Sequence, residues 1–152
     1  MAARHRFQHN GQTVYEWEQE YSEVSIFIQV PEGVRAKQLD ISIQPHHLRV
    51  GIQGLPPYLD KPLGGAVKAS DSLWTLEDGT LHIQLAKAEE GTTWASAIAG
   101  HELQADEQQA DQKRLLLERF QAEHPGFDFS SAEFTGGSVP DPRTFMRDVG
   151  QD

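Results

Sequence analysis

Short runs in the first part of the chain alternate apolar and polar residues: 15–21, 24–30, 39–44 and 47–52. In the second run Val24, Ile26 and Ile28 fall on one side of the chain, and Ser25 and Gln29 fall on the other. A period of two is typical of strands with one buried face. The turn residues between the last two runs predict that these runs pair as a hairpin.

A second hairpin is predicted further along the chain. Residues 72–76 and 80–87 keep the same alternation, and Asp78–Gly79 between them is a strong signal for a two-residue turn. No helical pattern separates the strands, so a parallel α/β sheet is disfavoured. The six or seven short strands predict an antiparallel β-sandwich over residues 14–96.

The segments outside these runs show weaker patterns. Residues 54–71 are rich in proline and glycine, which predicts irregular edge structure with one short strand near Tyr58 or Leu63. Residues 1–13 and 136–152 show no period, and we expect both to be flexible tails.

A helix is predicted over residues 102–123, which contain strong helix formers and neither glycine nor proline. Its first half is almost entirely polar, and its apolar stripe comes near the end: Leu115, Leu116, Leu117 and Phe120. We expect the stripe to dock either on the sandwich or on a partner protein. Residues 101–135 thus form a C-terminal segment made of this helix and an aromatic extension.

The composition narrows the possible partners. The chain has 152 residues and a net charge of −10, so we expect one compact core that binds neither nucleic acid nor a membrane surface. The chain contains no cysteine, which excludes disulfides, thiolate zinc sites and cysteine nucleophiles.

Motifs for catalysis are missing from the sequence. The glycines at 51 and 54 lack the third glycine of a dinucleotide-binding loop. His101–Glu102 resembles the start of a zinc-protease helix, but Ala105 occupies the position of the second histidine. His46 and His47 are adjacent, so on a strand they would point to opposite faces. We therefore predict no enzymatic activity, no metal and no cofactor.

Aromatic residues are the candidates for partner binding. Trp17 and Trp74 are in phase with apolar neighbours, which favours the core, with an exposed sheet-face patch as the alternative. Tyr21 and Phe27 would belong to that patch, and Phe27 is the better candidate because its face-mates are polar. We expect Trp94 to fold back over the sheet.

A second aromatic cluster follows the helix and comprises Phe127, Phe129 and Phe134. Three phenylalanines in an irregular stretch either fix the chain to the sandwich or act as anchors for another protein.

Several segments together resemble the CS domain, a seven-stranded sandwich: YEW, EVSIFIQVP, SLWTLEDGTLHIQLAKA and TTWAS. WTLEDG at residues 74–79 and RLLLERFQAEHPGFDFSSAEF at residues 114–134 are similar to motifs of the NudC (nuclear distribution C) family. The resemblance covers about residues 14–135. The motif positions that it carries over are Trp74, Leu76, Glu77, Asp78, Gly79, Phe120, Pro125, Asp128, Phe129 and Ser130.

The resemblance implies a co-chaperone. Members of the family are associated with heat-shock protein 90, with suppression of client aggregation and with stabilisation of β-propeller (WD-repeat) and dynein-pathway proteins. No catalysis is attributed to the fold. The long N-terminal region that carries self-association in larger NudC proteins has no counterpart here, and we expect a monomer.

The sequence thus predicts a non-enzymatic, client-binding protein in the cytoplasm, with the cytoskeleton or a cilium as further locations. The predicted partner-binding residues are Trp17, Tyr21, Phe27, Trp74, Glu77, Asp78, Phe127, Phe129 and Phe134. The alternative is a stable adaptor or structural subunit of a dynein- or microtubule-associated assembly. A ligand-binding sandwich enzyme would need a convergent pair of acids in a cleft.

Overall fold

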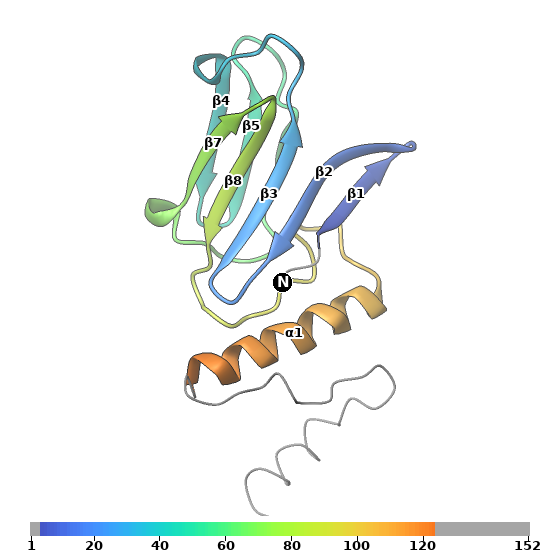
Figure 1. Ribbon diagram of the computed structural model, residues 1–152. Coiled ribbons are helices and arrows are strands. Elements are labelled where there is room, and N and C mark those ends of the chain that lie inside the picture. The colour runs from blue at the N-terminus through green and yellow to red at the C-terminus, as the bar shows by residue number, and fades with distance from the viewer. Residues whose placement is uncertain (1–3, 124–152) are drawn as a thin grey trace, which may run out of the picture. The chain divides into compact units, whose positions relative to one another are not determined.

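The computed structural model describes residues 4–123, and this part of the chain is a β-sandwich followed by a helix (Figure 1). The five-stranded sheet has the order β1-β2-β3-β8-β7 and the three-stranded sheet the order β4-β5-β6. All neighbouring strands are antiparallel. The predicted fold class, an antiparallel sandwich with a C-terminal helix, is confirmed, with eight strands within residues 4–123 in place of the seven expected.

The larger sheet contains β1 (His5–His9), β2 (Gln12–Gln19), β3 (Glu23–Gln29), β7 (Leu73–Glu77) and β8 (Thr80–Ala86). The smaller sheet contains β4 (Leu39–Gln44), β5 (His47–Ile52) and β6 (Leu59–Pro62). Short 3₁₀ turns, η1 (Ala36–Gln38) and η2 (Ala69–Asp71), precede β4 and β7, and the helix α1 spans Ala105–Glu123. The chain divides into two compact units within α1, the first ending at Leu116.

The core forms because the alternating residues of neighbouring strands align. Trp17 on β2 is opposite Ile26 on β3, which is opposite Ile83 on β8, which is opposite Trp74 on β7. Ile26 and Ile83 are fully buried, and Trp74 is partly buried against the same core. Such cross-strand rows are the unit of sheet stabilisation, so the register follows from the sequence pattern.

The prediction of a flexible tail over residues 1–13 is wrong, because residues 5–9 form the edge strand β1. Asn10 and Gly11 both have positive φ, 54° and 78°, as a tight hairpin turn between twisted strands requires. The strand is held by Phe7, whose ring stacks on His101 with centroids 3.8 Å apart. Asn10–Gly11 is itself a recognised sequence signal for a two-residue hairpin turn.

The connection from β8 to α1 is buried in its middle, around residues 94–98. Trp94 is 4% exposed and Ile98 is fully buried, so the prediction that Trp94 folds back over the sheet is confirmed. Ile98 also forms a β-bridge with Leu63, just after β6. The short strand predicted near Tyr58 or Leu63 is therefore present as β6.

The helix begins three residues later than predicted because residues 102–104 serve the preceding loop. Glu102 accepts a hydrogen bond of 2.8 Å from the Gly100 backbone N–H, and the Leu103 N–H donates to Ala95 at 2.8 Å. Asp106 and Glu107 lie in the first turn of α1, where acidic side chains favour the positive end of the helix dipole.

A buried polar cluster connects the first half of α1 to β1 and β2. Asp111 is 1% exposed, and its Oδ2 lies 2.9 Å from His5 Nε2 and 2.9 Å from Gln19 Nε2. Arg114 donates to the Gln19 carbonyl at 2.6 Å. Leu115, beside this cluster in sequence, is buried as well. The polar half of the helix is thus held against β1 and β2 by hydrogen bonds that the sequence pattern does not predict.

Gln19 uses both ends of its amide within this cluster. Its Nε2 also donates to the Trp94 carbonyl, and its Oε1 accepts from the Trp94 N–H, each at 2.9 Å. The same oxygen accepts from the buried Lys87 ammonium at 3.2 Å, and Lys87 donates to the Thr92 carbonyl at 2.6 Å. These bonds satisfy groups that burial would otherwise leave unpaired.

Candidate interaction site at one end of the sandwich

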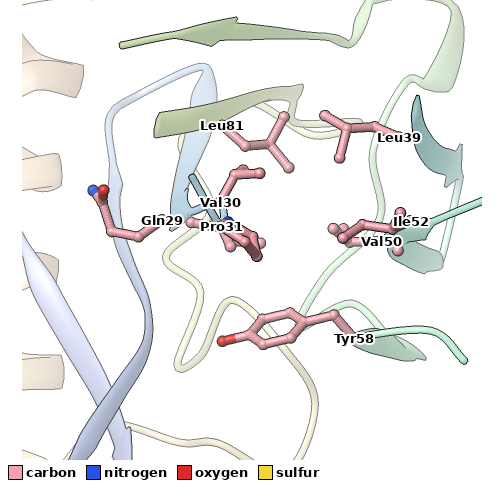
Figure 2. Close-up of a pocket in the computed structure, with 10 residues that line it drawn as sticks. Gln29, Val30, Pro31, Leu39, Val50, Ile52, Tyr58 and Leu81 are labelled. Atoms are coloured by element: carbon pink, nitrogen blue, oxygen red, sulfur yellow. The ribbon is translucent and has the colours of Figure 1, made fainter. Parts of the chain in front are cut away.

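A cavity of about 410 Å³ lies between the two sheets at one end of the sandwich. Its inner wall is aliphatic and consists of Ile28 from β3, Leu81 from β8, Leu39 from β4 and Val50 from β5. Figure 2 shows Leu39, Val50 and Leu81 pointing into the same space. All four wall residues are buried, because they belong to the inward faces of their strands.

The outer rim of the cavity is formed by Val30, Pro31, Ile52 and Tyr58 (Figure 2). Gln29 is the polar side chain of the lining, and Figure 2 shows it directed away from the space between the others. Among the described residues, the lining contains no charged one. The cavity therefore suits an apolar group, which would gain free energy by leaving water.

Tyr58 bridges the two sheets at the rim. Its hydroxyl donates a hydrogen bond of 2.7 Å to the Val14 carbonyl on β2, while its backbone N–H donates to the Val50 carbonyl on β5 at 2.8 Å. Partial burial raises the pKa of the Tyr58 hydroxyl, which therefore stays protonated as a donor. A Cβ at Gly51 would lie 3.2 Å from the Pro57 Cα, so a glycine allows the loop to lie this close to β5.

The turn between β7 and β8 adjoins the cavity. The Val30 N–H donates to the Gly79 carbonyl at 2.9 Å, which ties the rim to this turn. Asp78 and Gly79 have φ of 50° and 78°, as the Asp-Gly signal predicts. Asp78 on this turn and Glu77, the last residue of β7, are both exposed, so two predicted partner-binding residues lie beside the turn that contacts the cavity rim.

The tryptophans of the predicted binding set lie in or against the core. Trp17 is 2% exposed, so it lies in the core, as its phase with apolar neighbours favours, and not in the alternative patch on an exposed sheet face. Trp74 is partly buried and packs against the core from the edge strand β7. Tyr21 is partly buried beside Gly91, where a Cβ would meet its ring at 3.3 Å.

Phe27 lies on the outer face of the large sheet, away from the cavity, as its place in the alternation predicts. Its ring is covered by neighbours, in contrast to the isolated ring that the sequence suggests. The Arg4 guanidinium lies 3.9 Å from the ring centroid, and the His82 ring stacks on it with centroids 4.5 Å apart. Arg4 is held in turn by Glu16 and Glu18, at 3.3 and 3.5 Å. The structure does not bring Phe27 together with Glu77 and Asp78 in one cavity.

The remaining predicted aromatics, Phe127, Phe129 and Phe134, lie outside the described residues. Within residues 4–123 no three His, Asp or Glu side chains come together in a way that could hold a metal ion. In the same part of the chain, no helix has the length and apolar character to cross a membrane.

The sequence pattern predicts every strand that lines the cavity, but it does not predict the cavity itself. The alternation marks Ile28, Leu39, Val50 and Leu81 as inward-facing, which is the same signal that marks core residues. Whether inward-facing residues meet across the sandwich or leave a space depends on how the loops close its end. The one available signal is Leu55-Pro56-Pro57-Tyr58, an apolar loop sequence that a solvated loop does not require.

Comparison with known proteins agrees with this architecture. Residues 13–87 match the CS domain family. Human NudC domain-containing protein 2 is 37% identical over 126 residues, which cover 80% of this chain and 79% of the human protein. The nuclear movement protein nudc of Schizosaccharomyces pombe is 29% identical over 77% of this chain and 91% of its own length.

A solved structure shares the sandwich. The CS domain of the human KIAA1068 protein superposes with a TM-score of 0.52 at 26% identity, covering 59% of this chain and 75% of that domain. The sequence similarity extends well beyond the sandwich, along most of both this chain and human NudC domain-containing protein 2. The chain therefore belongs to the NudC family of CS-domain proteins.

Proposed function

We propose that this chain is a non-enzymatic co-chaperone of the NudC family that binds partly folded proteins and acts with heat-shock protein 90. Its proposed clients are β-propeller (WD-repeat) proteins and proteins of the dynein pathway. It acts in the cytoplasm as a monomer, with the cytoskeleton or a cilium as further sites. The observation that carries the proposal is the similarity to NudC proteins along most of the chain.

Two further observations support the proposal. Relatives bear names that refer to movement of the nucleus, the nuclear migration protein nudC of Drosophila melanogaster and the nuclear movement protein nudc of S. pombe. The sandwich also presents an apolar cavity that opens at its surface, which is the kind of feature that receives a side chain of another protein.

Client protection is the first test of this proposal. A protein that aggregates on mild heating is warmed with and without the full chain, and aggregation is followed by light scattering. We expect the chain to suppress scattering at near-stoichiometric ratios without ATP. Unchanged scattering at a large molar excess would argue against a client-binding role.

Partner capture separates the co-chaperone from the adaptor. Purified chain is used to capture partners from an extract of the cells that express it, with and without ATP, and the bound proteins are identified by mass spectrometry. Heat-shock protein 90 together with several WD-repeat proteins, in yields that ATP changes, is the expected result. A single stoichiometric partner that is indifferent to ATP would favour the stable adaptor.

The aromatic residues belong to the proposed binding surface and have their own test. Replacing Phe27 and Phe127 together by serine is expected to weaken client protection. Because Phe27 packs against Arg4 and His82, thermal unfolding of the variant is measured in parallel. Full protection by a folded double variant would remove both residues from the binding surface.

A further inference from the structure

We propose that the cavity at the end of the sandwich binds an apolar side chain of an extended partner segment, with a lysine or arginine of that segment beside the β7–β8 turn. This inference rests on the proposed function, because it assumes that protein segments are the ligands, and it specifies their chemistry. It is carried by the lining of the cavity and by the charges next to its rim.

The lining selects an apolar group. Ile28, Leu39, Val50 and Leu81 form an aliphatic wall, and no charged side chain of residues 4–123 lines the space. A charged or strongly polar group would lose its hydration there without gaining a partner. A volume of about 410 Å³ is within the range of small-ligand pockets and accommodates a leucine or an aromatic side chain.

Apolar surface continues outside the cavity along one side. Tyr58 at the rim is 54% exposed, and Leu55 in the same loop is 59% exposed. These are large exposed apolar side chains on an otherwise strongly charged protein. The cavity therefore fits one anchor residue of a longer segment that lies against this loop.

The charge beside the rim selects a basic neighbour for the anchor. Asp78 is exposed on the β7–β8 turn, and Glu77 is exposed beside it as the last residue of β7. The Gly79 carbonyl of this turn accepts the hydrogen bond from Val30. Neither carboxylate forms an ion pair within residues 4–123, whereas Glu16 and Asp40 do. Residues 69–86, which include η2, β7 and β8, contain no lysine or arginine.

Other charges near the cavity make the choice between a basic and an acidic neighbour of the anchor testable. Arg35 and Lys37 precede the wall residue Leu39 along the chain, and Glu32 follows the rim residue Pro31. A ligand guided by Arg35 and Lys37 would carry an acid beside its anchor. The preference for a basic or an acidic neighbour therefore shows which side of the cavity guides the ligand.

The test uses the full chain and short fluorescent peptides in a Gly/Ser framework. The first peptide has a leucine flanked by lysines, the second replaces the leucine by serine, and the third replaces the lysines by glutamates. Binding is measured by fluorescence anisotropy at low salt. We expect saturable binding of the first peptide and at least about tenfold weaker binding of the second, because a buried leucine contributes at least that factor.

Variants of the chain locate the binding site. Val30→Glu places a charge in the rim and is expected to abolish binding of the first peptide. Leu73→Glu is its control, on an exposed apolar residue of β7 away from the cavity.

A second pair of variants tests the charges. Glu77→Gln with Asp78→Asn is expected to weaken binding of the first peptide up to about fivefold, as the loss of exposed ion pairs does. Asparagine tolerates the positive φ at position 78. Glu89→Gln with Glu90→Gln is the control with the same change of net charge.

A measurement on the unmodified chain covers the case in which Val30→Glu does not fold. Amide chemical shifts of the ¹⁵N-labelled chain are expected to change, on adding the first peptide, at residues 28–30 and 50–52, which line the cavity, and at residues 77–81 around the adjoining turn. Shift changes confined to other residues would overturn the inference. Equal binding of the serine or glutamate peptide would overturn it as well.

The outcomes also separate this inference from the proposed function. If the chain suppresses client aggregation but binds none of the peptides, the cavity inference fails and the co-chaperone role stands. If the leucine–lysine peptide binds at the cavity and no client is protected, the cavity inference stands and the co-chaperone role fails.

Discussion

Gly64 shows how a single residue position can depend on a close backbone approach. A Cβ at this position would lie 1.8 Å from the Ser96 carbonyl oxygen, which belongs to the backbone and cannot rotate away. The Gly64 N–H also donates to the Ala97 carbonyl at 2.9 Å, so the two segments are held at this distance. Any side chain here would separate β6 from the buried connection that follows β8.

We predict that Gly64→Ala destabilises the protein by about 3 kcal/mol or more, because overpacking against a fixed backbone costs this much. The free energy of unfolding is measured by urea denaturation. The control is Gly54→Ala, where φ is 84° but nothing lies within 4 Å of the new Cβ. Its cost is expected to be about 1–2 kcal/mol of backbone strain. A smaller loss for Gly64→Ala than for Gly54→Ala would contradict the steric explanation.

Phe27 illustrates what the sequence can and cannot show about one residue. The period of two correctly assigns it to the outer face of the sheet. Its neighbour His82 is opposite it across the β3–β8 pair, whose two strands are far apart in the sequence. Arg4, however, belongs to a segment that shows no periodicity and was predicted to be a tail. The cover over the ring was therefore not predictable from local pattern.

At the scale of elements, the helix was predictable and its docking was not. Helix-forming residues and the absence of glycine and proline indicate α1 directly. The apolar stripe at its end was expected to dock it, yet the buried carboxylate of Asp111 connects its first half to the sandwich. In the sequence, Asp111 is one acid among several, and His5 lies 106 residues away. A pairing across that separation carries no local signal.

The pairing of His5 with Asp111 makes docking of the helix depend on pH. The hydrogen bond to Asp111 raises the pKa of His5 above its ordinary 6.5, against the opposing effect of burial. Burial would raise the pKa of Asp111, but hydrogen bonds from His5 and Gln19 outweigh it and lower the pKa below 3.8. The other charged groups facing the pair are Glu107, 3.7 Å from His5 Nδ1, and Arg114, 3.5 Å from Asp111.

The directions of these two pKa shifts set how the stability of the fold depends on pH. Because the pKa of His5 is raised on folding, its contribution to the free energy of unfolding is complete below about pH 6.5. That contribution is lost as the pH rises through the higher pKa of the folded protein. The contribution of Asp111 is present above about 3.8 and is lost as the pH falls through its lower folded value. We therefore predict that the pair stabilises the fold most between these limits.

The measurement is urea denaturation at about pH 5.5 and about pH 8.5, below and above the ordinary pKa of His5. Asp111→Asn is expected to cost about 1–3 kcal/mol at the lower pH and to reduce the difference between the two conditions. Asp71→Asn, on an exposed residue of η2, is the matched control and should keep the wild-type dependence. An identical pH dependence in Asp111→Asn would show that another group is responsible.

Gln19 on β2 forms hydrogen bonds with Trp94, in the segment between β8 and α1, and with Asp111 on α1. Replacing Gln19 should therefore cause local opening of α1. We predict that Gln19→Leu costs about 1–3 kcal/mol, because the Trp94 backbone and Asp111 lose hydrogen bonds in a buried setting. Hydrogen exchange should accelerate at the amides of residues 109–116 more than in β3 and β8. Gln112→Leu, on the exposed side of the same helix, should leave the exchange pattern unchanged.

At the scale of the molecule, the sandwich was predictable because most of its strands show the alternation of apolar and polar residues in their own sequence. The cavity was not, because it depends on how residues 53–58 cross the end of the two sheets. Pro57 approaches Gly51 and Tyr58 reaches Val14, contacts between segments whose relative position no local pattern sets. The same holds for the edge strand β1, which completes the large sheet and brings the beginning of the chain to the helix.

The position of β1 gives a prediction that involves the whole molecule. Deleting residues 1–9 removes His5 from Asp111, Phe7 from His101 and Arg4 from Phe27, and it leaves β2 as an uncovered edge. We expect the free energy of unfolding to fall by about 3–5 kcal/mol, as when one partner of a buried ion pair is removed. We also expect concentration-dependent association in sedimentation, because an unpaired edge strand is a template for another chain.

The control is deletion of residues 1–3 alone, which leaves β1 in place and should change neither the free energy of unfolding nor the association. If the longer deletion behaved like the shorter one, residues 5–9 would be the flexible tail that the sequence first suggested, and α1 would dock without them.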